Sequence, residues 1–338
     1  MGPSADATES APPTRRAGRL RDLGLVGATL LGLVALWFAM RGVDFGELRQ
    51  VLADAAVPEL ALGIAAILIT YPMLGLRWAV VAGKASGPPA GMVRWTLVGA
   101  AVNNIFPGRL GEAARALGLR RMTGGSALGA LGTVVVDRLA DVLLLVMLLA
   151  VTAPFIPGAD WVRWVLGAGA GVAVLAVIVL AAVIVWVRRT RREEGRLRAM
   201  VLRFARGLDC VDSPLTGLRI ALWTVALWGI WLVGAWLVAD ALGVRLSPVE
   251  TMFLAAAIGV GSAVPSAPGF VGTYHWVAAA SLALYGVAPA SAAAFALVLH
   301  AAWFLPTTLV GAVLMARLGV DWRSLRRSAV SMPAESVR

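Results

Sequence analysis

Six charged residues lie inside or beside long apolar stretches of this sequence, where a charge is hard to place. They are Arg109, Glu112, Arg115, Asp137, Arg138 and Asp141. Glu112 and Arg115 are three residues apart, and Asp137 and Asp141 are four apart, so each pair shares one face of a helix. A charge at membrane depth is costly. Such residues therefore face the interior of a helix bundle, pair with one another and usually mark a substrate pathway.

The charges of these three arginines and three carboxylates sum to zero, so they can compensate one another while the site is empty. One interpretation is a buried salt-bridge network that only fixes one helix against another. In the functional interpretation, Arg109 and Arg115 leave their carboxylate partners and bind an anionic headgroup. A guanidinium suits phosphate because its planar fork donates two parallel hydrogen bonds.

Two segments rich in proline and glycine interrupt the apolar stretches, one in each half of the chain. The first begins at Asn103-Asn104 and includes Pro107. The second contains Pro265, Pro268, Gly269, Tyr274 and His275. Irregular backbone at membrane depth survives only where it is buried in protein or lines a cavity. Corresponding breaks in the two halves therefore indicate a transporter's substrate site, and the helices that begin after each break would offer N–H donors to an anion.

The composition indicates a polytopic membrane protein that is all α-helical. The chain has 338 residues, of which 59% are hydrophobic and only 14% are charged. Soluble domains have about 45–50% apolar and about 25% charged residues. The net charge of +11 resides in the gaps between apolar segments, which is typical of cytoplasmic loops and argues against nucleic-acid binding.

Cofactor and metal sites are not expected. The two histidines, His275 and His300, have no cysteine or carboxylate neighbours at ligand spacing, so the sequence predicts no metal site. It also lacks the glycine-rich phosphate-binding loop of ATPases, which argues against direct use of ATP. The single cysteine, Cys210, cannot form an internal disulfide and fits a reduced, cytoplasmic loop.

Six apolar runs are long enough to cross a membrane, for which roughly 20 residues are needed. They are Leu23–Met40, Pro58–Val81, Ser126–Thr152, Val162–Val187, Thr216–Ala241 and Ala290–Ala316. Three shorter arms flank the two breaks: Met92–Phe106, Val249–Val264 and Val271–Gly286. We predict about six full transmembrane helices plus two re-entrant broken-helix hairpins, with eight or more hydrophobic helices in total. The alternative is a bundle of ten segments in which the short arms are ordinary tilted helices.

The arginine distribution predicts the orientation of these segments. Arginines are dense before the first run, in the loop of residues 188–215 and at the C-terminus, so both termini are predicted to be cytoplasmic. The two hairpins then enter from opposite sides, which makes the two halves an inverted repeat around a midplane site. The predicted organisation is a disordered cytoplasmic arm (1–21), a membrane domain (22–318) that includes the basic loop, and a cytoplasmic tail (319–338).

Three motifs resemble the lysylphosphatidylglycerol synthase membrane region, a large flippase-like family. The first is Asn103-Asn104-x-x-Pro107-Gly108-Arg109-x-Gly111-Glu112-x-x-Arg115. The second is Asp137-Arg138-x-x-Asp141, and the third is Pro265-x-x-Pro268-Gly269-x-x-Gly272-Thr273-Tyr274. Relatives commonly have glutamate after Gly-Thr-Tyr, where this sequence has His275. A histidine there would make the site less anionic and sensitive to pH.

The resemblance implies a multi-pass protein of the bacterial cell membrane that moves a phospholipid or lipid-linked precursor between leaflets. Such a protein is not an enzyme, and its partners would be the lipid substrate, the bilayer and possible further copies of itself. One alternative is a non-transporting accessory to lipid or polyprenyl-sugar biosynthesis. Another is an intramembrane serine hydrolase with Ser262 or Ser266 as nucleophile and His275 or His300 as base.

Overall fold

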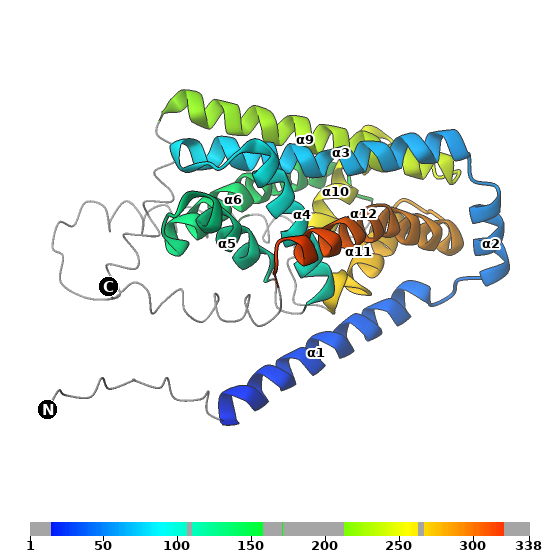
Figure 1. The fold of residues 1–338 in the computed structure, drawn as a ribbon. Coiled ribbons are helices and arrows are strands. Elements are labelled where there is room, and N and C mark those ends of the chain that lie inside the picture. The colour runs from blue at the N-terminus through cyan, green and yellow to red at the C-terminus, as the bar shows by residue number, and fades with distance from the viewer. Residues whose placement is uncertain (1–14, 107–109, 158–170, 172–212, 263–266, 321–338) are drawn as a thin grey trace, which may run out of the picture.

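The chain folds into a bundle of helices (Figure 1). The computed structural model describes residues 15–106, 110–157, 171, 213–262 and 267–320, and these contain helices and no strand, which confirms the all-α prediction. The long helices are α1 (Arg15–Met40), α3 (Val57–Ala82), α6 (Ala127–Thr152), α9 (Pro214–Ala241) and α12 (Pro289–Arg317). The shorter ones are α2 (Phe45–Ala53), α4 (Pro89–Ile105), α5 (Gly111–Thr123), α10 (Pro248–Gly261) and α11 (Thr273–Ala283), with single turns η1 (Gly83–Ala85), η2 (Ala153–Phe155) and η3 (Pro268–Phe270).

Three of the described helices are long and apolar enough to cross a membrane: α3 with η1, α9 and α12. A fourth crossing is present if α1 and α2, which meet at 82°, form one broken span. The predicted count of six spans is therefore not confirmed. Helix α6 has the length of a span, but Asp137, Arg138 and Asp141 lie in its middle. The predicted span Val162–Val187 lies outside the described residues.

The N-terminal helix starts earlier than the sequence predicted. Helix α1 begins at Arg15, inside the arm of residues 1–21 that was expected to be disordered. Arginine is a good helix former, so the basic residues before the apolar run can extend its helix. Residues 1–14, most of the basic loop at 188–215 and the tail from residue 321 lie outside the described residues.

Helices α4 and α5, on either side of the first break, pack antiparallel and in close contact. Near the break, a side chain at Gly111 would collide with the Gly99 carbonyl oxygen. Farther along, Gly118 of α5 lies against the Trp95 ring of α4. Glycine lets the two backbones approach, as small residues do between membrane helices. The pair therefore forms a helical hairpin that turns at the first break.

Helices α10 and α11 form a similar pair around the second break. Gly261 lies against Val277 near the break, and the Phe253 and Tyr285 rings lie 5.9 Å apart at the far end. Between the two helices, Gly269 has φ 67° and Gly272 has φ 90°, and the latter's α-carbon faces the backbone of Gly32 in α1. These are left-handed conformations that glycine adopts without steric cost. Both breaks are thus the turns of antiparallel helix pairs.

The helix contacts of the two halves correspond. If α3, α4, α5 and α6 are matched in order with α9, α10, α11 and α12, the contact of α4 with α12 matches that of α6 with α10. The contact of α5 with α6 likewise matches that of α11 with α12. Helices α3 and α9, which are equivalent in this scheme, pack antiparallel along the edge of the bundle (Figure 1). At one end the Ala56 amide donates to the Ala241 carbonyl at 2.9 Å.

Three apolar clusters are present among the described residues, and helix α3 contributes to the two larger ones. The first contains Ile67 of α3 together with residues of α9, α10, α11 and α12. The second contains Trp78 of α3 with residues of α4, α5 and α6. The stretch of α3 between Ile67 and Trp78 belongs to neither cluster, and it faces the cavity described next.

Candidate functional site

A cavity of about 340 Å³ lies between the two halves. The long helices line it near their midpoints, with Tyr71 of α3, Arg138 of α6, Trp228 of α9 and Trp303 of α12. For helices that span a bilayer, this places the cavity near the middle of the membrane. Ligand pockets range from about 300 to 1,000 Å³, so the cavity lies near the lower end of that range.

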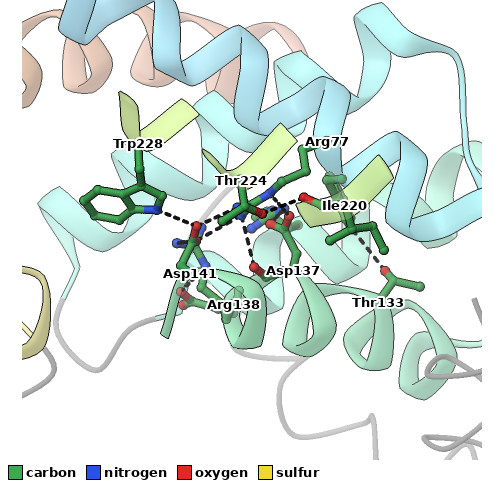
Figure 2. A network of polar contacts seen from close by, with 11 residues as sticks. Arg77, Thr133, Asp137, Arg138, Asp141, Ile220, Thr224 and Trp228 are labelled. Atoms are coloured by element: carbon green, nitrogen blue, oxygen red, sulfur yellow. Dashed lines mark hydrogen bonds and ion pairs between the residues drawn. The ribbon is translucent and has the colours of Figure 1, made fainter. Parts of the chain in front are cut away.

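Arg77 of α3 bonds to Asp141, which lines the cavity, and uses all five of its N–H groups (Figure 2). It donates to the Asp137 carboxylate at 2.8 Å and its carbonyl at 3.0 Å, and to both Asp141 oxygens at 2.6 and 3.0 Å. The fifth bond goes to the Thr224 hydroxyl of α9 at 3.1 Å. Arg77 is fully buried. Because all five of its N–H groups are bonded to the protein, it has no donor left for a ligand. It joins α3, α6 and α9 and acts as a structural centre.

Arg115 of α5 differs from Arg77 because two of its three nitrogens have no partner in the part of the chain that the structure describes. Its Nη2 donates to Asp137 at 2.7 Å, and its guanidinium lies 4.4 Å from the centre of the Trp78 ring. The Nε and Nη1 atoms are buried and have no hydrogen-bond partner among the described residues, although the side chain lines the cavity. Leaving buried charged donors unpaired is costly. An anion in the cavity would satisfy them.

Arg138 and Glu112 are held loosely at the edge of the same cavity. Arg138 reaches Asp141 at 3.4 Å and Glu112 at 3.9 Å, and 42% of its side chain is accessible. Glu112 keeps 28% of its side chain accessible and accepts a long 3.4 Å bond from Asn103. These contacts are longer than good charge-assisted hydrogen bonds, which measure about 2.7–2.9 Å. Both side chains can therefore change partners at little cost.

The two asparagines of the first break bond to different helices. The Asn103 side-chain oxygen accepts from the Gly111 amide at 2.7 Å, so it joins the end of α4 to the start of α5. The Asn104 amide donates to the Thr307 and Thr308 hydroxyls of α12 at 3.2 and 2.8 Å. Both asparagines line the cavity. The first break is thereby tied to the second half of the bundle.

The second break and helix α12 supply an aromatic wall. Phe270, Tyr274 and Trp303 line the cavity, and the Tyr274 and Trp303 rings lie 5.8 Å apart. Phe270 has φ 60°, an uncommon conformation for a residue with a side chain. The Tyr274 hydroxyl is buried without a hydrogen-bond partner among the described residues. The cavity therefore has a charged side, from α5 and α6, and an aromatic side.

His275 lies behind this wall and does not line the cavity. It is buried, and its Nδ1 accepts from the Gly272 amide at 3.3 Å at the start of α11. A glutamate at this third position of a helix accepts the same bond in a capping box, so the imidazole performs that capping role here. His300 of α12 bonds the Gly269 carbonyl at 2.8 Å, and the two imidazole rings lie 4.7 Å apart. Both histidines hold the second break in shape.

The structure brings together most of the residues that the sequence predicted for the site. The cavity is lined by Asn103, Asn104, Glu112, Arg115, Arg138, Asp141 and Tyr274. Asp137 lies directly behind them, and Pro268 and Gly269 form the turn that carries Phe270. The remaining predicted residues, Pro107, Arg109 and Pro265, lie outside the described residues.

Sequence reasoning missed Arg77, Trp228 and Trp231. Trp228 donates from its indole to Asp141 at 3.0 Å, and both tryptophans line the cavity. Arg77 could have been found, because it is a charged residue within the apolar run Pro58–Val81 and the cost of intramembrane charge applies to it equally. The tryptophans carried no such signal, because other tryptophans occur along the same helix.

Comparison with known proteins agrees with the motifs. No curated protein and no solved structure matches this chain. The family profile described as the lysylphosphatidylglycerol synthase TM region matches residues 24–311, which include every residue that lines the cavity. The chain is therefore an integral membrane protein that belongs to the lysylphosphatidylglycerol synthase TM region family.

Proposed function

We propose that this protein moves an anionic phospholipid or a lipid-linked precursor between the leaflets of the bacterial cell membrane. The observation that supports this most is that two Arg115 nitrogens, in a cavity at mid-helix depth, have no hydrogen-bond partner in the described part of the chain. A phosphodiester offers the acceptor oxygens that these donors lack. The six described charges around the cavity are three arginines and three carboxylates, and Arg109 lies outside the described residues.

The shape of the cavity favours a lipid over a free anion. Its other side is aromatic, and Val142 of α6 both lines it and is 39% exposed on the helix surface. The cavity thus reaches the flank of α6, where acyl chains could remain in the bilayer while the headgroup lies inside. Binding of a free phosphate would not require such a lateral opening.

An inverted repeat of two units, each a long helix, a re-entrant hairpin and a long helix, accounts for this architecture. Equivalent helices α3 and α9 run antiparallel, so the axis that relates the two units lies perpendicular to them, in the membrane plane. Both hairpin turns border the mid-depth cavity, through Asn103 and Glu112 in one and Ser262 and Phe270 in the other. Such a site between inverted repeats is the arrangement of alternating-access transporters.

Cysteine labelling tests this topology. Single cysteines at Ala85 and Gly125, which flank α4–α5, and at Arg245 and Ala288, which flank α10–α11, are all exposed positions in a Cys210→Ser background. We expect a membrane-impermeant maleimide to reach 85 and 125 only from the cytoplasmic side, and 245 and 288 only from outside. If the two members of either pair label from opposite sides, those helices span the membrane and the hairpins are not re-entrant.

Lipid movement tests the function. The purified protein in phosphatidylcholine vesicles should accelerate the transfer of acyl-chain-labelled phosphatidylglycerol between leaflets, measured by dithionite quenching. Arg115→Lys keeps a cation for Asp137 but loses the donors that face the cavity. Because a hydrogen bond to a charged group contributes about 1.5–3 kcal/mol, the rate should fall at least about tenfold.

The matched control is Arg121→Lys, on the exposed end of the same helix. This variant should move lipid at the wild-type rate. If Arg115→Lys and Arg121→Lys transport equally well while both are folded, Arg115 does not bind the phosphate.

The described residues give no support to serine hydrolase chemistry, and we propose that the protein is not an enzyme. The Ser262 hydroxyl donates to the Gly259 carbonyl at 2.8 Å. The histidine rings are bonded to the backbone of Gly269 and Gly272. Ser266 lies outside the described residues.

A further inference from the structure

Two buried hydroxyl groups in the wall of the cavity have no hydrogen-bond partner among the described residues. They belong to Thr96 of α4, which is 2% exposed, and Tyr274 of α11, which is 4% exposed. A hydroxyl that leaves water without gaining a new partner destabilises the protein. A ligand in the cavity can supply both missing partners.

The Thr96 hydroxyl is unusual among the buried threonines of this bundle. Within a helix, a threonine can donate to the carbonyl three or four residues earlier. Thr133, Thr224 and Thr307 do so at 2.7–2.8 Å. Thr96 makes no such bond to any residue that the structure describes, although the Met92 carbonyl lies one turn before it in α4. Its hydroxyl is therefore left available to the cavity that the residue lines.

The Tyr274 hydroxyl has no acceptor for its proton among the described residues. The Trp303 indole lies beside it, with the ring centres 5.8 Å apart, but an indole N–H can donate and cannot accept. A ligand group next to Tyr274 should therefore be able to accept a hydrogen bond. An ammonium group does not meet this need, because it has donors and no acceptor.

A phosphate by itself leaves these hydroxyls without a clear partner. The Nε and Nη1 atoms of Arg115, which have no partner in the described part of the chain, carry three N–H donors. The two non-bridging oxygens of a phosphodiester can be taken up by these donors. Thr96 and Tyr274 come from helices of different halves of the bundle, so they can contact other parts of the headgroup. Hydroxyl groups suit them, because a hydroxyl both donates and accepts.

The aromatic residues of the cavity favour a ring that carries these hydroxyls. Phe270 and Trp303 line one wall with Tyr274, and the rings of Trp228 and Trp231, which also line the cavity, lie 5.6 Å apart on α9. The face of an aromatic ring is negative. The C–H groups on the face of a sugar or cyclitol ring are slightly positive, while its hydroxyls point outward from the rim. Such a ring can pack on an aromatic wall and still form hydrogen bonds at its edge.

We propose that the headgroup consists of a phosphodiester joined to a hydroxylated six-membered ring, which is a sugar or a cyclitol. This inference rests on the proposed function and specifies its substrate class. The phosphate binds Arg115, the ring packs against the aromatic wall, and its hydroxyls bond to Thr96 and Tyr274.

Binding of matched soluble lipids to the full-length protein in neutral detergent tests the proposal. Dioctanoyl phosphatidylinositol carries a cyclitol ring, and dioctanoyl phosphatidylmethanol has the same phosphodiester without a hydroxyl. Because each neutral hydrogen bond changes an affinity by about two- to tenfold, phosphatidylinositol should have a Kd at least about tenfold lower. Geranyl glucosyl phosphate and geranyl methyl phosphate repeat the comparison on an isoprenoid chain, and the pair with the larger ratio identifies the lipid. A ratio near one in both pairs overturns the proposal.

Variants that lack one hydroxyl test the contacts. Tyr274→Phe and Thr96→Val should each weaken the binding of phosphatidylinositol about two- to tenfold and leave that of phosphatidylmethanol unchanged. Tyr285→Phe is the matched control, because the Tyr285 hydroxyl is also buried without a described partner but does not line the cavity. If all three variants bind phosphatidylinositol equally well, the hydroxyls do not contact the headgroup and the proposal is wrong.

Thermal unfolding without lipid gives an independent reading. Neither Tyr274→Phe nor Thr96→Val should lower the unfolding temperature, because each removes a hydroxyl that has no described partner. A fall of several degrees in both variants would show that the protein itself uses these hydroxyls, which would overturn the proposal.

The remaining outcomes separate this inference from the proposed function. If phosphatidylinositol and phosphatidylmethanol bind equally and Arg115→Lys weakens both, the ring is not recognised and anionic lipid binding stands. If dioctanoyl phosphatidylethanolamine binds more tightly than phosphatidylinositol, an ammonium group occupies the place of the ring and the proposal is overturned. If folded wild type binds none of these lipids, the proposed function fails together with the inference.

Discussion

Replacing Arg77 with methionine is expected to prevent the protein from reaching a stable fold. The substitution removes five hydrogen bonds and leaves Asp137 and Asp141 buried without their main cation. Breaking a buried ion pair by removing one partner costs about 3–5 kcal/mol, a large part of the stability of most domains. Arg77→Lys should be intermediate, because an ammonium has three donors and lacks the planar fork.

This effect is measured as the temperature of thermal unfolding in detergent, with size-exclusion chromatography used to detect the folded protein that remains after heating. Arg94→Met is the matched control, because Arg94 is exposed on α4. The Arg94→Met protein should unfold at the wild-type temperature. The double variant Arg77→Met with Asp141→Asn should recover part of the loss, since it also removes one of the uncompensated carboxylates. A normally stable Arg77→Met protein would show that the Arg77 contacts do not hold α3, α6 and α9 together.

The positions of the helices could be predicted from the sequence because the signals are local. The predicted runs Pro58–Val81 and Thr216–Ala241 lie within helices α3 and α9. Pro89, Pro214 and Pro289 each stand in the first turn of a helix, where proline lacks only a hydrogen bond that would be missing anyway. Apolar length and proline position are read within a single segment, so no knowledge of the packing is needed.

The partners of the charged residues could not be predicted in the same way. The sequence indicated that Arg115 and Asp137 are buried, but Arg77 contacts Asp137 across 60 positions of the chain. That contact depends on how α3 packs against α6, and the sequence alone does not specify it. Among the described residues, all five N–H groups of Arg77 have partners and most of those of Arg115 do not, and this difference depends on geometry and not on residue type.

His275 is a second residue whose role could not be predicted from its type. The sequence suggested a residue of the binding site whose protonation tunes transport, because it stands where relatives have glutamate. The structure places it at the third position of α11, bonded to the amide of Gly272 and out of the cavity. Helix capping and ligand binding use the same residue types, so the residue type does not separate them. If lipid movement by His275→Gln and by wild type changes with pH in the same way, His275 serves only as a helix cap.

Filling the cavity is expected to abolish lipid movement without harming the fold. Ala100 of α4 lines the cavity and is only half-buried, so an indole at this position can extend into the free space. Ala100→Trp should occupy much of the 340 Å³ and exclude a headgroup while the charged residues remain in place. Ala61→Trp is the matched control, because Ala61 is exposed on α3 and an indole there faces the lipid.

We propose that an anionic headgroup crosses the membrane through the cavity between the two broken segments, and this crossing can be measured. It is tested most directly by the transfer of labelled phosphatidylglycerol in vesicles that contain wild type, Ala100→Trp or Ala61→Trp, each shown to be folded by its thermal transition. We predict rapid transfer with wild type and Ala61→Trp, and a rate equal to that of empty vesicles with Ala100→Trp. Transfer by Ala100→Trp at the wild-type rate, or none by folded wild type, would contradict the account.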